Sequence, residues 1–465
     1  MKLIISNEIT IEDPSSQLLA YCEKNLVIPN PDFAKKKRMG MWIGNTPEKI
    51  SLYRVDGNKL IIPTGAGKQI YDFVRGCESR IDIANNNPID YQAKLPLYDY
   101  QLPAVDKMIV NSCGILQAPC GSGKTQMGIA IATELNLKTL WLTHTQDLLN
   151  QSYERAAQYI DKKLLGTITA GKVNIGTGIT FATVQTLSKL DLCQFKYSFD
   201  VIIVDECHRC AGTPTSVSMF SKVINSVAAK HKYGLSATVH RGDGLIKSTF
   251  ALLGLVIYEV PESAVADKTM KVTVEKIKTE IEIAECCLDT DGTLIYQELI
   301  KYLAENVTRN RMVAENIAIS FQQGHSCLVL SDRLEHLQSI MSICIECGVS
   351  DKRMRFINGK MTSKKARVER VQALEDMRTG KAKVLFASYS LAKEGLDIPQ
   401  LDRLFLALPK KDYAVVTQSI GRIGRTADGK TDAICYDYVD SIGFCENAWK
   451  KRKTSYKKKG CVIHD

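Results

Sequence analysis

Ala118-Pro-Cys-Gly-Ser-Gly-Lys-Thr125 lies between an apolar run at residues 114–117 and an amphipathic stretch at residues 126–135. This order predicts a strand, a glycine-rich turn and a helix. Together they form a phosphate-binding loop, because backbone N–H groups and the helix N-terminus surround phosphate oxygens. Lys124 would reach the β- and γ-phosphates of a nucleotide, and Thr125 would bind Mg²⁺. A chance glycine-rich turn is the alternative, since Ala118 stands where the pattern has its first glycine. The residues expected to hold the phosphates are Pro119, Cys120, Gly121, Ser122, Gly123, Lys124 and Thr125.

A second apolar run, Val201-Ile-Ile-Val204, ends in two carboxylates, Asp205 and Glu206. In a parallel sheet the end of this strand lies on the same edge as the phosphate loop. Asp205 can then hold Mg²⁺, and Glu206 can accept a proton from an attacking water. A solvated acidic turn is the alternative interpretation.

Near the C-terminal end, Gln418-Ser-Ile-Gly-Arg-Ile-Gly-Arg425 places Arg422 and Arg425 four and seven residues after Gln418. This spacing puts the three side chains on one face of a helix. A forked guanidinium stabilises charge on a transferring phosphoryl group, whereas a basic surface helix is the alternative.

Short apolar runs and longer helical patterns alternate along the chain from about residue 111. This alternation predicts an α/β fold with parallel sheets covered by helices on both faces. The apolar runs lie at residues 114–117, 139–142, 179–182, 201–204 and 232–235, and a second set lies at 326–330, 355–357, 383–387, 403–407 and 432–438. We expect a small, mainly β (α+β) N-terminal domain at 1–90, α/β domains at 91–260 and 295–447, a polar connection at 261–294 and a basic tail at 448–465.

The ordered set of motifs resembles a superfamily 2 helicase or translocase of the DExH type, with two RecA-like domains in tandem. The phosphate loop is similar to motif I, Asp205-Glu-Cys-His208 to motif II, Ser236-Ala-Thr238 to motif III and residues 418–425 to motif VI. Tyr98-Asp-Tyr-Gln101 resembles the adenine-reading Q motif, with Tyr98 where the family usually has Arg. Residues 141–146, 181–186, 328–333 and 390–397 resemble motifs Ia, Ib, IV and V.

The resemblance implies a role for each matched residue in ATP hydrolysis coupled to movement on nucleic acid. Those implied to act on ATP directly are Lys124, Asp205, Glu206, Gln418, Arg422 and Arg425. Gln101, Gly395 and Asp397 would contact the nucleotide, with Thr125 and Asp205 at Mg²⁺. His208, Ser236 and Thr238 would couple hydrolysis to motion. The residues implied to touch nucleic acid are Thr143, Thr183, Ser331, Arg333 and Arg241.

Two further stretches resemble one branch of the superfamily. Val239-His-Arg-Gly-Asp-Gly244 is similar to an element that follows motif III in XPB-like helicases. Met41-Trp-Ile-Gly-Asn-Thr-Pro47 resembles part of the front domain of UvsW-like phage helicases, which remodel branched DNA. The resemblance implies a DNA helicase or translocase of recombination, replication or repair, with Lys35-Lys-Lys-Arg38 helping the front domain to bind DNA. An RNA helicase and a duplex translocase that does not separate strands are the alternatives.

Composition agrees with an acidic partner. The 465 residues carry a net charge of +10, and residues 450–465 contain seven Lys or Arg. This basic tail either binds phosphates or is a solvated end, and its removal is expected to spare ATP turnover. The absence of a long apolar run predicts no membrane span, and 15 irregularly spaced cysteines favour reduced thiols. We therefore expect a cytoplasmic monomer, phage-encoded if the resemblance to phage enzymes holds, that binds ATP, Mg²⁺ and nucleic acid, most readily DNA.

Overall fold

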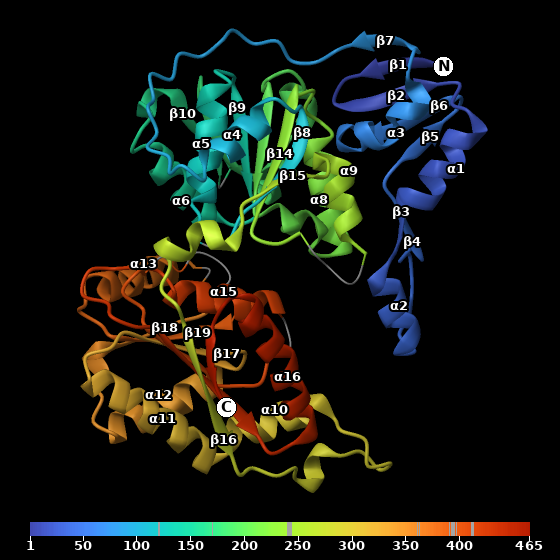
Figure 1. Ribbon diagram of the computed structural model, residues 1–465. Coiled ribbons are helices and arrows are strands. Elements are labelled where there is room, and N and C mark those ends of the chain that lie inside the picture. The colour runs from blue at the N-terminus through green and yellow to red at the C-terminus, as the bar shows by residue number, and fades with distance from the viewer. Residues whose placement is uncertain are drawn as a thin grey trace. The chain divides into compact units, whose positions relative to one another are not determined.

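The computed structural model describes residues 1–119, 121–169, 171–239, 244–359, 361, 363–389, 391, 396, 398–410 and 413–465. The chain forms two compact units, Met1–Ala264 and Val265–Asp465 (Figure 1). None of the described helices combines the length and the apolar character that a membrane span requires.

The first unit begins with a five-stranded sheet in the order β5-β6-β2-β1-β7. Its strands are β1 (Lys2–Ile5), β2 (Glu8–Glu12), β5 (Arg54–Asp56), β6 (Lys59–Pro63) and β7 (Glu78–Ile81), with helices α1 (Ser16–Asn25) and α3 (Gly67–Val74). Leu18 and Leu60 share one core with Ala251 of the following part of the unit. At Gly65 a Cβ would lie 2.5 Å from the backbone nitrogen of Leu253, so only glycine fits this contact. The region expected as a separate domain therefore has its own sheet but not its own core.

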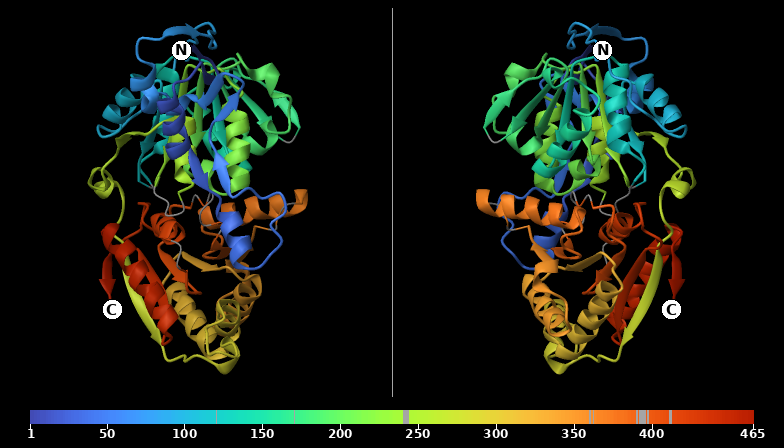
Figure 2. Two further views of the ribbon diagram at one scale, coloured as in Figure 1. Left: turned by 90° about the vertical axis from the view of Figure 1, so that its right-hand side faces the viewer. Right: turned by 90° about the vertical axis from the view of Figure 1, so that its left-hand side faces the viewer.

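An arm extends from this sheet (Figures 1 and 2). It is a two-stranded antiparallel ribbon of β3 (Val27–Pro29) and β4 (Lys49–Ser51), with helix α2 (Pro31–Arg38) at its tip. The Asn30 side chain begins α2 by accepting a hydrogen bond from the Asp32 N–H at 3.0 Å.

The larger sheet of the first unit has eight strands in the order β11-β10-β12-β9-β13-β14-β8-β15. They are β8 (Cys113–Gln117), β9 (Thr139–Thr143), β10 (Leu165–Thr169), β11 (Lys172–Asn174), β12 (Ile179–Thr183), β13 (Val201–Asp205), β14 (His231–Ser236) and β15 (Val256–Glu259). All the pairings are parallel except that of β10 with β11. The predicted parallel α/β sheet is thus confirmed, and the strands expected at 114–117, 139–142, 179–182, 201–204 and 232–235 are β8, β9, β12, β13 and β14.

Helices cover both faces of this sheet. They are α4 (Leu102–Ile109), α5 (Lys124–Glu134), α6 (Gln146–Ala156), α7 (Val184–Leu187), α8 (Pro214–Ile224) and α9 (Ile246–Leu253). Leu140 and Leu142 of β9 pack with α7, α8 and α9, whereas Trp141 between them lies against Gly128 of α5. Because successive strand residues point to opposite faces, α5 and the α7–α9 group lie on opposite sides.

The second unit contains a seven-stranded sheet in the order β18-β19-β17-β20-β21-β16-β22, in which every described pairing is parallel. Its strands are β16 (Thr273–Thr279), β17 (Cys327–Ser331), β18 (Met354–Ile357), β19 (Val384–Ser388), β20 (Arg403–Leu406), β21 (Ile434–Asp440) and β22 (Val462–His464). Its helices are α10 (Tyr296–Glu305), α11 (Val307–Gln322), α12 (Leu334–Glu346), α13 (Lys364–Arg378), α15 (Tyr413–Ile423) and α16 (Gly443–Lys458). The second predicted parallel domain is confirmed.

Two segments differ from their expected character. The connection at 261–294 contributes β16, which pairs with β21 and β22 inside the second sheet. The basic tail at 448–465 forms most of α16 and all of β22, and Trp449, Arg452 and Tyr456 on α16 are buried. Its lysine-rich composition suggested a solvated end, but the buried residues recur at helical spacing and place one face in the core.

Candidate functional site

The phosphate loop joins β8 to α5, as its sequence predicts. Gly121 and Gly123 have φ angles of +85° and +76°, which glycine adopts without strain. A Cβ at Gly123 would also lie 2.5 Å from Nε2 of Gln101. The loop therefore needs glycine at Gly123 for both its backbone angle and its packing.

Polar groups of this loop converge at the N-terminus of α5. Nζ of Lys124 lies 3.3 Å from the Ala118 carbonyl oxygen and 3.4 Å from that of Pro119. The Ser122 hydroxyl is buried and has no hydrogen-bond partner among the described residues. Half-buried Thr125 follows Lys124 in the first turn of α5. A buried unpaired hydroxyl, an ammonium and a helix N-terminus together fit the phosphates of a nucleotide.

Gln101 lies behind the loop and braces it. Its Nε2 donates to the Ser122 carbonyl at 2.7 Å, and its Oε1 accepts from the Tyr98 N–H at 2.9 Å. The Tyr100 hydroxyl donates to the same Ser122 carbonyl at 3.1 Å, and its ring stacks on Tyr98. Gln101 is only 2% exposed and its amide holds the loop, whereas its contact with adenine stays a prediction.

The acidic pair stands at the end of β13. Since β14 lies between β13 and β8, the pair and the phosphate loop occupy the same edge of the sheet. Burial raises the pKa of Asp205 to about 7, the charge of Glu206 adds to this, and Lys124 opposes it. Ser152 Oγ lies 3.4 Å from Asp205 Oδ2. Glu206 has φ +49°, a left-handed conformation that is uncommon for non-glycine residues and strained for a glutamate.

His208 stands between this pair and the end of β14. Nδ1 of His208 lies 3.2 Å from Oε2 of Glu206 and 3.0 Å from Oγ of Ser236. The Ser236 hydroxyl donates to the Thr238 carbonyl at 2.7 Å, so Nδ1 of His208 supplies the proton between them. The predicted coupling residues are therefore brought together, with Thr238 joined through its backbone.

Two of the predicted nucleic-acid contacts are neighbours at one sheet edge. Thr143 and Thr183 end β9 and β12 and are paired in register. Both threonines are buried. The Thr143 hydroxyl donates to the Thr145 carbonyl at 3.0 Å, and the Thr183 hydroxyl bonds to the Thr186 hydroxyl at 2.8 Å, so each side chain stabilises the turn that follows its strand.

In the second unit, Ser331 ends β17 and is fully buried. Its hydroxyl lies 3.0 Å from Nδ1 of His336 and accepts from the Arg333 N–H at 3.1 Å. The Arg333 guanidinium donates to the Gln297 carbonyl at 3.2 Å. Ser331 thus positions the turn that carries Arg333.

The arginine motif lies on and just beyond α15. Gln418 and Arg422 are on the helix, but α15 ends at Ile423, so the prediction that all three side chains share one helix face is wrong for Arg425. Oε1 of Gln418 is buried without a hydrogen-bond partner among the described residues, and Arg422 donates to the Leu396 carbonyl at 3.1 Å. Arg425 forms an isolated β-bridge with Thr269. The predicted site residues outside the described part of the chain are Cys120, Arg241, Gly395 and Asp397.

Sequence reasoning missed Lys430, which supports this motif. Its Nζ donates to the carbonyls of Ile423 at 2.5 Å, Leu401 at 2.6 Å and Arg425 at 2.7 Å. Burial lowers the pKa of Lys430 to about 8. A lysine after Gly429 in a polar turn has the pattern of a solvated residue, so no sequence signal indicates this role.

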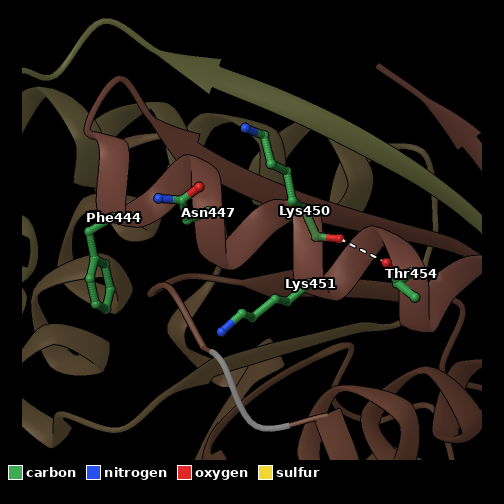
Figure 3. A pocket seen from close by; sticks show the side chains of 5 residues that line it. All are labelled: Phe444, Asn447, Lys450, Lys451 and Thr454. Carbon is green, nitrogen blue, oxygen red and sulfur yellow. Dashed lines mark hydrogen bonds between the residues drawn. The ribbon is translucent and has the colours of Figure 1, made fainter.

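The exposed face of α16 carries a basic hollow of about 560 Å³ (Figure 3). Its lining residues are Phe444, Asn447, Lys450, Lys451 and Thr454. These lysines belong to the expected tail, and they project from an ordered helix.

Comparison with known proteins shows which families this chain matches. Residues 94–241 match the family described as "Type III restriction enzyme, res subunit", and residues 308–427 match "Helicase conserved C-terminal domain". A putative ATP-dependent RNA helicase of Acanthamoeba polyphaga mimivirus is 28% identical over 84% of this chain and 73% of its own. The ATP-dependent DNA helicase uvsW of Enterobacteria phage T4 is 25% identical over 89% of this chain and 84% of its own.

Structural similarity supports the same fold. A putative HsdR subunit fragment of a type I restriction enzyme from Vibrio vulnificus has a TM-score of 0.57 and 17% identity, and the match covers 80% of this chain and 69% of that one.

The chain belongs to the superfamily 2 helicases, with one domain of each matched type. It is an ATP-hydrolysing helicase or translocase that binds nucleic acid.

Proposed function

We propose that this chain couples ATP hydrolysis to movement along DNA, and that it unwinds forks or drives branch migration. The observation that carries the proposal is the acidic pair beside the phosphate loop, with the His208–Ser236 hydrogen bond leading away from it. DNA is favoured because the T4 relative, named as a DNA helicase, is similar along most of this chain. A Sulfurisphaera tokodaii relative named as a DNA 3'-5' translocase supports the same choice.

In this proposal the first unit binds the nucleotide. Lys124 and the N–H groups of the loop offset phosphate charge, and Thr125 and Asp205 supply oxygen ligands that suit Mg²⁺. The raised pKa of Asp205 fits such a role, since a buried carboxylate is stabilised by a cation beside it. When bound, Mg²⁺ neutralises charge on the phosphates. Glu206 accepts the proton of the attacking water.

The second unit supplies the remaining positive charge. Arg422 and Arg425 are the proposed guanidinium groups for charge on the γ-phosphate. Gln418, on the helix that carries Arg422, offers a buried amide oxygen that has no hydrogen-bond partner among the described residues. The contacts of Thr143, Thr183, Ser331, Arg333 and Arg241 with nucleic acid are likewise part of the proposal.

We propose that the hydrogen bond between His208 and Ser236 couples ATP hydrolysis to movement along nucleic acid. The Ser236→Ala, Thr238→Ala double variant should keep ATPase activity and lose unwinding. A double variant that unwinds normally would contradict this coupling.

The decisive experiment measures ATPase and strand displacement with single strands, forks, four-way junctions and RNA duplexes. We expect the strongest stimulation by forks or junctions. Lys124→Ala and Glu206→Gln should each lower turnover by roughly 100-fold or more, the scale typical of lost charge stabilisation in a transition state. Absence of stimulation by every nucleic acid would overturn the proposal.

An RNA helicase is the second candidate, because the mimivirus relative carries that name. Stimulation by RNA duplexes alone would select it. A translocase that moves on duplex without separating strands would show DNA-stimulated ATPase and no strand displacement.

A further inference from the structure

The tip of the arm exposes the most accessible tryptophan of the chain. Trp42 is 88% exposed, whereas Trp141 and Trp449 are 0% and 4% exposed. Its neighbours Met39 and Met41 are 58% and 52% exposed. Contiguous exposed apolar side chains on a soluble protein mark an interaction site.

These side chains do not stabilise the fold. Helix α2 has no buried residue, and the core beneath the arm takes Ile28 from the ribbon and Leu52 directly after it rather than residues of the tip. The Trp42 ring instead lies over Gly44, where a Cβ would meet ring atoms at 2.8 Å. Gly44 thus leaves room for the ring against the backbone while the rest of the indole faces solvent.

The tip is nevertheless ordered. The Asn30 side chain donates to the Pro47 carbonyl at 2.8 Å, and Nζ of Lys36 donates to the Thr46 hydroxyl at 2.7 Å. The Met41 N–H donates to the Lys36 carbonyl at 2.9 Å. These bonds fix the loop that presents Trp42, so little ordering entropy opposes binding there.

Positive charge lies close to this aromatic side chain along the chain. Lys35, Lys36, Lys37 and Arg38 form the last turn of α2, four residues or more before Trp42, and only Asp32 and Glu48 oppose them on the tip. Cations beside an exposed indole suit a ligand that offers both phosphates and flat aromatic faces, which is the chemistry of nucleic acid.

Base faces are available only where stacking is interrupted. In a continuous duplex each base is covered by its neighbours, whereas a single strand or a branch point offers an uncovered face. We propose that Trp42 stacks on an unpaired base at a single-stranded region or branch point, while the α2 cations hold the flanking phosphates. This inference rests on the proposed function and names the feature of DNA that the arm recognises.

The test uses tryptophan fluorescence of the full-length chain, because the two buried tryptophans give a constant background. The probes are a single-stranded oligonucleotide, a fork and a blunt duplex of the same sequence. Single strand and fork should quench Trp42 emission at saturation, and blunt duplex should not. Trp42→Phe should remove this signal.

Affinity measurements complete the test. Trp42→Ala should weaken fork binding about tenfold, within the range for one lost base stack, and change blunt-duplex binding by less than about twofold. Trp42→Phe should retain most of the affinity. Tyr71→Ala is the matched control, since Tyr71 is a 58% exposed aromatic residue on α3 of the same sheet domain. The Lys35→Gln, Lys37→Gln double variant should weaken the binding of all three ligands alike and flatten the salt dependence of that binding.

Two outcomes would overturn the inference: unchanged Trp42 emission on a saturating fork, or equal loss of fork and blunt-duplex affinity in Trp42→Ala. DNA-stimulated ATPase of the unaltered chain separates the two proposals. If that ATPase is present while Trp42→Ala binds forks normally, only the role of Trp42 fails.

Discussion

Gly123 meets two constraints at once, a φ angle of +76° and a position where a Cβ would lie 2.5 Å from Gln101. Gln101 cannot move aside cheaply, because it is buried and holds Ser122 and Tyr98. We predict that Gly123→Ala lowers ATP affinity at least about tenfold, since backbone N–H groups of this loop must face phosphate oxygens. Titration with a fluorescent ATP analogue measures the effect.

Gly76 provides the control at the same scale. Its φ angle is +82°, but a Cβ there would meet nothing within 4 Å. Gly76→Ala should therefore cost about 1 kcal/mol of stability through backbone strain alone and leave ATP affinity unchanged. Equal loss of ATP affinity in both variants would show that the contact with Gln101 has no role.

The turn between β17 and α12 depends on a neutral histidine. Buried His336 bonds to Ser331 at 3.0 Å and to Asn310 at 2.8 Å. Burial lowers the pKa of His336 to about 3, and the charges of Arg309 and Arg333 act in the same direction. Between pH 3 and pH 6.5 the unfolded chain binds a proton that the folded chain does not, so stability falls as pH falls through this window.

We predict that the second unit loses about 2 kcal/mol at pH 5 relative to pH 7 from His336 alone. His336→Gln, which keeps a donor and an acceptor, should lack this contribution. Urea unfolding of both proteins, followed by hydrogen exchange of β17, measures the difference. Parallel pH profiles for the two proteins would contradict the prediction.

The C-terminal end of α15 depends on Lys430, whose ammonium donates to four carbonyls around the arginine motif. Lys430→Met leaves those carbonyls without their donor and should loosen the turn that carries Arg425. We expect kcat for ATP to fall about tenfold, less than when a charge-stabilising group is removed outright, because Arg425 is displaced but still present, with ATP affinity unchanged. Lys365→Met is the control, because Lys365 is an exposed lysine on α13. If Lys430→Met loses ATP affinity and keeps its kcat, Lys430 does not act by positioning Arg425.

For the molecule as a whole, the C-terminal segment is structural. Arg452 binds both carboxylate oxygens of Asp437 at 2.7 Å, and both side chains are almost fully buried. Deleting residues 448–465 would leave Asp437 unpaired, at a cost of roughly 3–5 kcal/mol, and remove β22 from the sheet. We predict that the second unit unfolds, which circular dichroism and limited proteolysis measure. This reverses the expectation that ATP turnover survives removal of the tail.

The exposed lysines of the same helix separate charge from folding. Lys450→Gln with Lys451→Gln should change stability by less than about 0.5 kcal/mol, because both side chains face solvent. If this segment binds phosphates, the variant should also flatten the salt dependence of nucleic-acid binding. For the deletion of residues 448–465, a second unit that stays fully folded would disprove the structural role of the C-terminal segment.

The sequence alone determined the two parallel α/β domains, the phosphate loop, the acidic pair and the helix that carries Gln418 and Arg422, but not the end of that helix before Arg425. Each is a local pattern, and parallel topology brings strand ends such as Asp205 and the loop before Lys124 to one edge. Only the tertiary structure decided that Gln101 braces the loop, that Lys430 supports the arginine motif and that Arg452 belongs to the core. These roles depend on partners distant in sequence or on burial of a charged residue, and neither leaves a periodic signal in the chain.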